Sequence, residues 1–264
     1  MPGAIAEVAA GAAALGLAAG GLAYASLWPT SQIFGRTLIA GDDGNEVALT
    51  FDDGPNDAAT PQLLEVLARH GVRATFFAMG DFARARPEIV RQVVAAGHVV
   101  GNHTMSHPRL STASAARVRQ ELAECNAVLE EITGAAVKFF RPPYGARRPY
   151  VLRAARELGL TPVLWNVTGY DWNPIGVEGI LANLDAGIAR NRRRGRGSNL
   201  LLHDGGHRAM GTARMDTVRA VDRLLTVRLA APENGAAMRF VTVDAWAGMW
   251  PRRDGPAIDI SFDS

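Results

Sequence analysis

The chain has 264 residues, and its 28 lysine and arginine residues nearly balance its 26 aspartate and glutamate residues, which leaves a formal net charge of +2. This balance gives no support for a nucleic-acid partner. The single cysteine, Cys125, excludes an intramolecular disulfide bond and argues against a cysteine-ligated metal site, while the length suits one large α/β domain.

The N-terminal stretch from Val8 to Trp28 has 21 consecutive residues without a charge, about the length that spans a bilayer. It is rich in alanine and glycine, and no lysine or arginine lies within or before it, so it is an atypical export signal. The segment at 23–25 has the pattern of a signal-peptide cleavage site, whereas Gly16 and Gly20 are spaced as in packed membrane helices. We expect residues 1–30 to be a cleaved signal peptide or a membrane anchor, with a buried soluble helix as the third interpretation.

Strand-like and helix-like segments alternate almost to the end of the chain, after a predicted linker at residues 31–46. The expected strands are 47–51, 74–78, 99–102, 137–140, 162–167, 199–202 and 239–243. The expected helices, most of them bounded by proline or glycine, are 61–70, 87–96, 115–133, 149–158, 177–190 and 212–229. Such alternation predicts a parallel sheet with helices packed outside it.

An array of this kind would fit either an open doubly wound sheet or an incomplete barrel. No glycine-rich phosphate loop follows the first strand, which gives a dinucleotide-binding fold little support. A barrel makes a sharper prediction, because its functional side chains gather at the carboxyl ends of several strands. We expect one domain at residues 47–250, followed by a polar tail at residues 251–264.

Charged and aromatic side chains follow five of the expected strands, always at the carboxyl end. The five clusters begin at Asp52, His103, Arg141, Asp171 and His203. Because the carboxyl ends of barrel strands surround one mouth, this shared position indicates a single site.

His103 and His107 are four residues apart, a spacing that brings two imidazoles to one side of a helical turn and is common in zinc sites. Pro108 disfavours a helical conformation at His107, so we expect the pair in a loop or tight turn. Surface or capping histidines are the simpler interpretation of the pair alone. An aspartate across the mouth would complete a three-ligand set that leaves metal positions open for water and substrate.

The tripeptide Asp-Asp-Gly occurs twice, at residues 42–44 and at residues 52–54. No strand precedes the first copy, which we interpret as a solvated turn. An apolar strand precedes the second copy and would hold its carboxylates rigidly at a cleft, as general base catalysis and metal binding both require. Turn capping is the structural alternative for Asp52 and Asp53.

Five ordered segments resemble the motifs of the polysaccharide deacetylases, the NodB-homology enzymes of carbohydrate esterase family 4. They are Thr-Phe-Asp-Asp-Gly-Pro at 50–55, His-Thr-Met-Ser-His-Pro at 103–108, Arg-Pro-Pro-Tyr-Gly at 141–145, Asp-Trp at 171–172 and Leu-Leu-His at 201–203. The resemblance covers residues 47–243 and implies an α/β fold, a distorted (β/α)7 barrel that is NodB-like. It also implies removal of acetyl groups from N-acetylated sugar polymers with one divalent metal, Zn²⁺ being expected and Co²⁺, Ni²⁺ or Mn²⁺ being alternatives.

The resemblance assigns a role to each matching residue. Asp53, His103 and His107 would bind the metal. Asp52 would act as the catalytic base and His203 as the catalytic acid.

Other matching residues would position these groups or shape the pocket. Arg141 would hold the base in place, and Asp171 would hold the acid and favour its charged form. The backbone N–H of Tyr144 would help to bind the oxyanion. Leu201 and Trp172 would form the pocket for the acetyl methyl group.

One position departs from the family pattern, and it leaves the substrate open. The fourth motif reads Asp-x-x-Asp-Trp in many members, whereas Thr168 stands at its first position here. The expected substrate is an N-acetylated glycan such as peptidoglycan or chitin. An esterase for O-acetylated polysaccharide such as xylan and an inactive glycan-binding barrel are the alternatives. Because residues 1–30 are expected to be a signal peptide or a membrane anchor, we expect a protein of the cell envelope, either membrane-anchored or secreted.

The remaining histidines and a run of arginines have simpler interpretations. We expect His70 and His98 to be structural, and His207 to lie near the mouth within reach of substrate. Five arginines lie within residues 190–197, before the sixth strand. They would face anionic lipid headgroups if the N-terminal segment stayed in a membrane.

Overall fold

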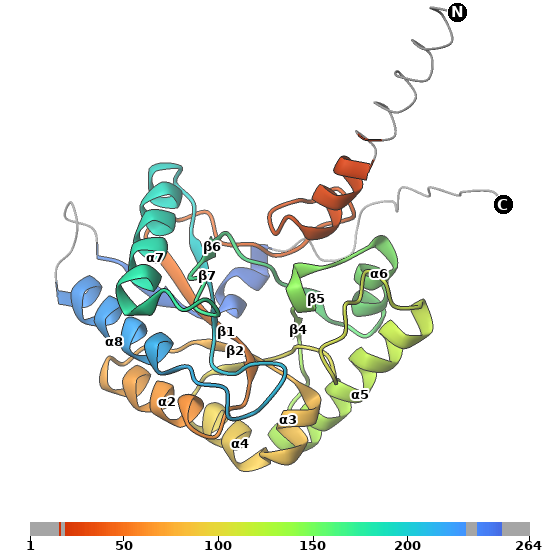
Figure 1. Ribbon diagram of the computed structural model, residues 1–264, viewed down its shortest axis with the longest axis horizontal. Coiled ribbons are helices and arrows are strands. Elements are labelled where there is room, and N and C mark those ends of the chain that lie inside the picture. The colour runs from red at the N-terminus through yellow and green to blue at the C-terminus, as the bar shows by residue number, and fades with distance from the viewer. Residues whose placement is uncertain (1–15, 17–18, 231–236, 250–264) are drawn as a thin grey trace, which may run out of the picture.

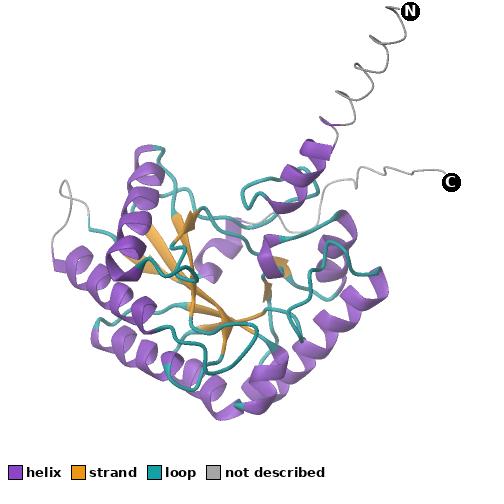
Figure 2. Cartoon of the chain, viewed as in Figure 1, coloured by secondary structure: helices purple, strands orange, loops and turns teal. Residues whose placement is uncertain are grey.

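The computed structural model describes residue 16, residues 19–230 and residues 237–249. The strands form one curled sheet in the order β5-β4-β3-β2-β1-β7-β6, with β8 paired to β1 off this path. Each of these pairings is parallel. Helices cover the outside of the curl, as Figures 1 and 2 show. The expected distorted (β/α)7 barrel is thereby confirmed.

The strands are β1 (Glu46–Gly54), β2 (Thr75–Ala78), β3 (Val99–Asn102), β4 (Phe139–Phe140), β5 (Thr161–Pro162), β6 (Val167–Thr168), β7 (Ser198–His203) and β8 (Arg239–Val241). The α-helices are α2 (Ala59–Arg69), α3 (Gly80–Ala85), α4 (Pro87–Ala95), α5 (Ala115–Thr133), α6 (Pro149–Glu157), α7 (Gly176–Arg193) and α8 (Met215–Ala230). Two 3-10 segments complete the set, η1 (Pro143–Gly145) and η3 (Val243–Met249). The six expected helices are present, and the short helix α3 is an addition that the sequence pattern does not predict.

The expected strand at 162–167 is two short strands, β5 and β6, at opposite ends of the sheet. β5 pairs with β4 and β6 pairs with β7, so one stretch of chain joins both ends of the curl. Between them, Leu38 forms a parallel bridge with Val163, and its N–H donates to the carbonyl of Pro162 at 2.8 Å. The barrel is distorted here because a residue of the predicted linker, rather than a continuous strand, fills the space.

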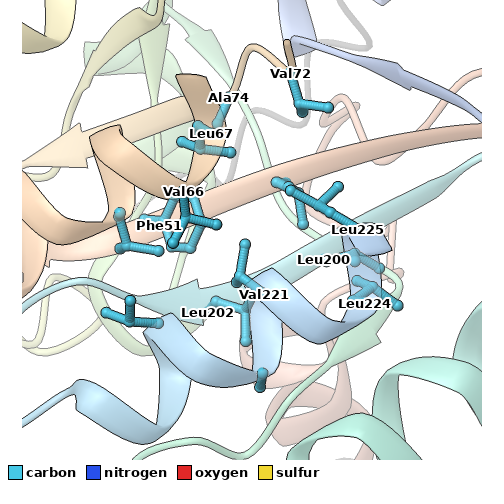
Figure 3. Close-up of a cluster of buried hydrophobic side chains, with 14 of the residues drawn as sticks. Phe51, Val66, Leu67, Val72, Ala74, Leu200, Leu202, Val221, Leu224 and Leu225 are labelled. Carbon is cyan, nitrogen blue, oxygen red and sulfur yellow. The ribbon is translucent and has the colours of Figure 1, made fainter. Parts of the chain in front are cut away.

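The largest apolar cluster lies between α2, α8 and the strands β1 and β7 (Figure 3). Phe51 and Leu202 from the strands belong to it, with Leu67 and Val221 from the helices. Burying each such side chain contributes about 1.5–3 kcal/mol, so these contacts fix the strand against the helices. Since successive side chains of a strand point to opposite faces, Asp52 faces the barrel interior.

Residues 19–27 are helical and lie near the start of α6 (Figure 1). The buried Arg147 joins this segment to the barrel, because its backbone N–H donates to the Ser26 carbonyl at 3.0 Å. Its guanidinium donates to the carbonyls of Trp28 at 2.8 Å and Ser31 at 2.7 Å, just after the helix. The predicted signal or anchor at 1–30 is only partly described, and the predicted tail at 251–264 lies outside the described residues. Of the helices in the described part of the chain, none has both the length and the apolar character needed to cross a membrane.

Candidate active site

The site begins where β1 ends, because this strand carries two adjacent carboxylates to the barrel mouth. Asp52 and Asp53 are both buried, and Asp53 has a left-handed backbone conformation with a φ of 69°. A Cβ at Gly54 would lie 2.2 Å from Asp204 Oδ2, so glycine is required at this close approach. The two carboxylates therefore lie inside the protein and not in a solvated turn.

Asp53 meets both histidines of the predicted pair. Its Oδ1 lies 3.3 Å from His103 Nε2 and 3.1 Å from His107 Nε2. His103 Nδ1–H donates to the Arg141 carbonyl at 2.8 Å, which leaves Nε2 directed at the carboxylate. His107 has a φ of 59°, so it lies in a tight turn, as the following proline predicts. The fold brings together the three residues that the family resemblance assigns to a metal.

The surroundings of Asp53 suit a bound cation. Burial would raise the pKa of Asp53, but the imidazoles of His103, His107 and His207 hold it well below its usual range. Burial lowers the pKa of His107, which favours the neutral ring that binds metals. Among the described residues, Asp53 Oδ1 has no partner with hydrogen-bond geometry, although two ring nitrogens lie within 3.3 Å of it. A divalent cation would satisfy these converging lone pairs, and carboxylate with imidazole is a ligand set that suits Zn²⁺.

Asp52 has a different partner from its neighbour. Its Oδ1 accepts a hydrogen bond from Arg141 Nη1 at 2.9 Å, and the same nitrogen donates to Thr50 Oγ1 at 2.7 Å. Arg141 is fully buried, with its guanidinium carbon 4.2 Å from the centre of the Phe77 ring. Because breaking a buried ion pair of this kind costs about 3–5 kcal/mol, Arg141 holds the Asp52 carboxylate in one position.

His203 lies beside Asp52, because β7 pairs with β1 in a register that places these two residues opposite each other. Its Nδ1–H donates to Asp171 Oδ1 at 2.9 Å, and its backbone N–H donates to Asp171 Oδ2 at 2.8 Å. Thr217 Oγ1 donates to the same carboxylate at 2.8 Å. Burial would lower the pKa of His203, but attraction to Asp171 outweighs it and raises this pKa to about 9. The imidazolium is therefore the favoured form near neutral pH.

The three predicted pocket residues differ in exposure. Trp172 is 45% exposed and meets the His203 ring edge to face, with ring centres 5.3 Å apart. Tyr144 is equally exposed, and its ring centre lies 4.7 Å from that of His107. Leu201, by contrast, is buried in a small apolar cluster. The two aromatic side chains are thus accessible at the mouth, whereas Leu201 belongs to the wall.

Two residues after β7 lie close to the end of β1. The sequence predicts His207 near the mouth but not its contact with Asp53, and it assigns no role to Asp204. His207 lies against Asp53, with its Nδ1 3.6 Å from Asp53 Oδ2. Asp53, His107 and His207 each offer one possible metal-ligand atom, and these three atoms lie within 4.8 Å of one another. Asp204 instead accepts a hydrogen bond from Thr60 Oγ1 at 2.5 Å, and burial raises the pKa of Asp204 to about 7. The Gly-Gly pair before His207 is the sequence signal for this close approach.

Three polar residues stay away from the site, as expected. His70 Nε2 lies 2.8 Å from an Asp222 carboxylate oxygen, and His98 Nδ1 accepts a backbone N–H at 3.1 Å. Asp43, from the first Asp-Asp-Gly copy, accepts the N–H of Asn45 in a turn. Their roles are structural.

Comparisons with known proteins agree with this geometry. The polysaccharide deacetylase family profile matches residues 40–163. A chitooligosaccharide deacetylase from Sinorhizobium fredii is 43% identical over 167 residues, which cover 63% of this chain and 75% of the relative. A peptidoglycan N-acetylglucosamine deacetylase, solved with bound 4-naphthalen-1-yl-N-oxidanyl-benzamide, is 34% identical with a TM-score of 0.67. That match covers 79% of this chain and 91% of the solved one.

A pseudoenzyme of the CE4 family from Bacillus anthracis is also similar, at 26% identity and a TM-score of 0.65. This match covers 76% of the present chain and 64% of the other. The five motifs, the family profile and the related sequences point to the same conclusion. The chain belongs to the polysaccharide deacetylases, the NodB-homology enzymes of carbohydrate esterase family 4.

Proposed function

We propose that this protein is a metal-dependent hydrolase that removes acetyl groups from N-acetylated sugar residues of a polysaccharide of the peptidoglycan or chitin type. One observation carries the proposal: Asp52, held by Arg141, and His203, held by Asp171, lie opposite each other on neighbouring strands. The three candidate metal ligands, Asp53, His103 and His107, lie next to them. The chitooligosaccharide and peptidoglycan deacetylases among the relatives support this substrate class.

The residues match the requirements of amide hydrolysis. The site must make a nucleophile from water, stabilise an oxyanion and protonate the leaving amine. A divalent metal held by Asp53 and the two paired histidines would polarise the carbonyl and lower the pKa of water. Asp52, fixed by Arg141, takes the proton from the attacking water. His203, charged because Asp171 stabilises its imidazolium, gives a proton to the nitrogen that leaves.

The 3-10 turn η1 supplies a backbone donor for the oxyanion. Tyr144 and Gly145 both have left-handed conformations, with φ of 58° and 64°. A Cβ at Gly145 would lie 2.9 Å from the Trp165 ring, so the turn packs closely and is held in shape. We assign the backbone N–H of Tyr144 to the oxyanion, because a preorganised donor needs no rearrangement during the reaction.

Two alternatives remain in view. The same site could attack the ester of an O-acetylated polysaccharide, since an ester is the easier electrophile. An inactive glycan-binding barrel is the alternative of another class, and the pseudoenzyme neighbour shows that this fold occurs without activity. The presence of both proton-transfer groups, with Asp53 and the histidine pair, favours an active enzyme.

Acetate release tests the proposal and separates these alternatives. The protein would be incubated with peptidoglycan, chitin oligomers and acetylated xylan, before and after removal of metal with a chelator. We expect release from an N-acetylated glycan that stops after chelation and returns with Zn²⁺, or with Co²⁺, Ni²⁺ or Mn²⁺. Release from xylan alone would favour the esterase, and release from none of them the glycan-binding barrel. Activity untouched by complete metal removal would refute the mechanism.

We also propose that the protein works at the cell envelope, anchored by its N-terminal segment or secreted after cleavage. The uncharged stretch at 8–28 supports this, as do the exposed side chains of Leu22, Leu27, Trp28 and Ile33. Fractionation of cells that express the tagged full chain, with determination of its N-terminus, tests the location. An intact N-terminus in the membrane fraction supports an anchor, and a new N-terminus near residue 25 supports a signal peptide. Intact protein in the cytoplasm would contradict both.

A further inference from the structure

The loop after β7 places one more histidine, His207, beside the candidate metal ligands Asp53, His103 and His107, which are called the ligand cluster below. A Cβ at Gly205 would lie 2.1 Å from the carbonyl oxygen of Asp53, so only glycine lets the loop pass this close. Arg214 Nε donates to the Gly205 carbonyl at 2.6 Å and holds the loop from the other side. The backbone N–H of His207 then donates to Asp53 Oδ2 at 3.3 Å. The position of His207 is therefore fixed by backbone contacts.

The ring of His207 is oriented with one nitrogen towards the cluster. Its Nδ1 lies 3.6 Å from Asp53 Oδ2, and its ring stacks on that of His107 with centres 4.4 Å apart and an angle of 12° between planes. A separation of this size between a nitrogen and a carboxylate oxygen is too long for a hydrogen bond but leaves room for a shared cation.

The other nitrogen of the His207 ring has a partner of its own. Nε2 lies 3.4 Å from the hydroxyl of Tyr144. The Arg109 guanidinium lies over the ring of this tyrosine, with its carbon 4.7 Å from the ring centre. Histidines that bind a metal almost always place their second nitrogen against such a hydrogen-bonding group, which fixes the tautomer. With the proton on Nε2, the lone pair of Nδ1 is directed at the cluster.

We propose that His207 is a fourth protein ligand of the metal, bound through Nδ1 and supported by the Tyr144 hydroxyl. The proposal deepens the proposed function, on which it rests, and adds a nitrogen ligand to Asp53, His103 and His107. The His207 side chain is 33% exposed, so this ligand would lie on the solvent side of the ligand set and would strengthen metal retention in the resting protein.

Metal affinity, measured on the full chain by competition with a chromophoric chelator, tests this role. We expect His207→Ala to lower Zn²⁺ affinity at least about tenfold, since even groups that only orient ligands contribute 10- to 100-fold. Tyr144→Phe should lower it less, and His70→Ala, at a histidine bound to Asp222, should leave it unchanged. Circular dichroism would verify that each variant is folded.

The visible spectrum of the Co²⁺-loaded protein gives a second readout that does not depend on turnover. Loss of a nitrogen ligand should change the absorption bands of the His207→Ala variant and leave those of His70→Ala unchanged. Unchanged Zn²⁺ affinity with an unchanged Co²⁺ spectrum would overturn the proposal, even if the unaltered protein is an active deacetylase. A folded, metal-binding protein without acetate release would instead overturn the proposed function alone.

Discussion

The two Asp-Asp-Gly copies, ten residues apart, end in very different surroundings. The Asp43 side chain of the first copy is 40% exposed, and its Oδ2 lies 3.2 Å from Nη2 of Arg239, whose side chain is 58% exposed. The Asp53 side chain of the second copy is only 6% exposed and lies within 3.3 Å of two imidazole nitrogens. The second copy follows five buried residues of β1, whereas the first lies in the approach to that strand. The apolar strand before the tripeptide, and not the tripeptide itself, takes the carboxylates to the site.

The two carboxylates of the second copy also differ from each other. Asp52 pairs with Arg141 inside the barrel, while Asp53, in a left-handed conformation, turns towards the histidines. Neighbouring residues of one chemical type can therefore take separate roles because their partners come from different strand ends. Single substitutions at the two copies test both levels of the comparison.

Asp53→Ala should have the largest effect. It removes the only carboxylate of the proposed ligand set, so Zn²⁺ affinity should fall by more than about a hundredfold, beyond the 10- to 100-fold typical of groups that merely orient ligands. Acetate release should fall to background and not return when Zn²⁺ is added. Metal content by atomic emission is the measurement, with Asp43→Ala as the matched change in the first copy. Full metal content in Asp53→Ala would remove this residue from the ligand set.

Asp52→Asn should abolish most turnover while leaving metal content intact. The amide keeps the shape of the side chain and can still accept from Arg141, but it cannot take a proton from water. Loss of a general base lowers kcat by about 10²- to 10⁴-fold. Steady-state acetate release and metal content measured on the same sample check this, with thermal unfolding as the control for the altered Arg141 pair. Near-normal turnover would exclude Asp52 as the base.

Asp171→Asn should change the pH dependence of the reaction. Asp171 raises the pKa of His203 to about 9, so the acid form is present at neutral pH and is lost as the pH rises through that value. Without the carboxylate, the attraction that opposes burial is weakened and the pKa of His203 falls from about 9, which moves the alkaline limb of the kcat profile to lower pH.

The raised pKa of His203 also predicts how the stability of Asp171→Asn depends on pH. A raised histidine pKa stabilises the fold below about pH 6.5 and loses this contribution as the pH rises to about 9, while the lowered pKa of Asp171 stabilises it above about pH 3.8 and not in stronger acid. Asp171→Asn should therefore destabilise the protein most between about pH 4 and pH 6.5. Thr217→Ala, which removes one hydrogen bond to Asp171 but keeps its charge, should move the alkaline limb less. An unchanged limb in Asp171→Asn would show that His203 is not the titrating acid.

The sequence predicts the strand ends well because a parallel barrel leaves them little freedom. Once Asp52, His103, Arg141 and His203 each follow an apolar strand, the common direction of the strands brings them to one mouth. The helices are predicted for a similar local reason, since proline and glycine mark their limits. Both features depend on short-range pattern, and both agree with the structure.

Features that depend on which segments become neighbours are harder to predict. The apolar run at 162–167 has one pattern, yet its two ends pair with β4 and β7, and Leu38 enters between them. The approach of His207 to Asp53 depends on Gly205. Glycine is required there because the end of β1 passes so close that a Cβ at Gly205 would lie 2.1 Å from the Asp53 carbonyl oxygen. The Gly-Gly pair before His207 indicates a close approach, but nothing in the loop itself indicates that Asp53 is the residue approached.

Asp43→Asn should have the smallest effect, and it tests the comparison at its other end. The substitution removes an exposed ion pair with Arg239, whose Nη2 also lies 2.7 Å from Glu46 Oε1 and so keeps a carboxylate partner. Exposed pairs contribute about 0–1 kcal/mol, because water screens them and two long side chains lose freedom. The free energy of unfolding should therefore change little, and less still at high salt, with Zn²⁺ affinity and kcat unchanged. A several-fold loss of Zn²⁺ affinity or of kcat would mean that the first copy influences the site. The preceding strand would then not explain the difference between the two copies.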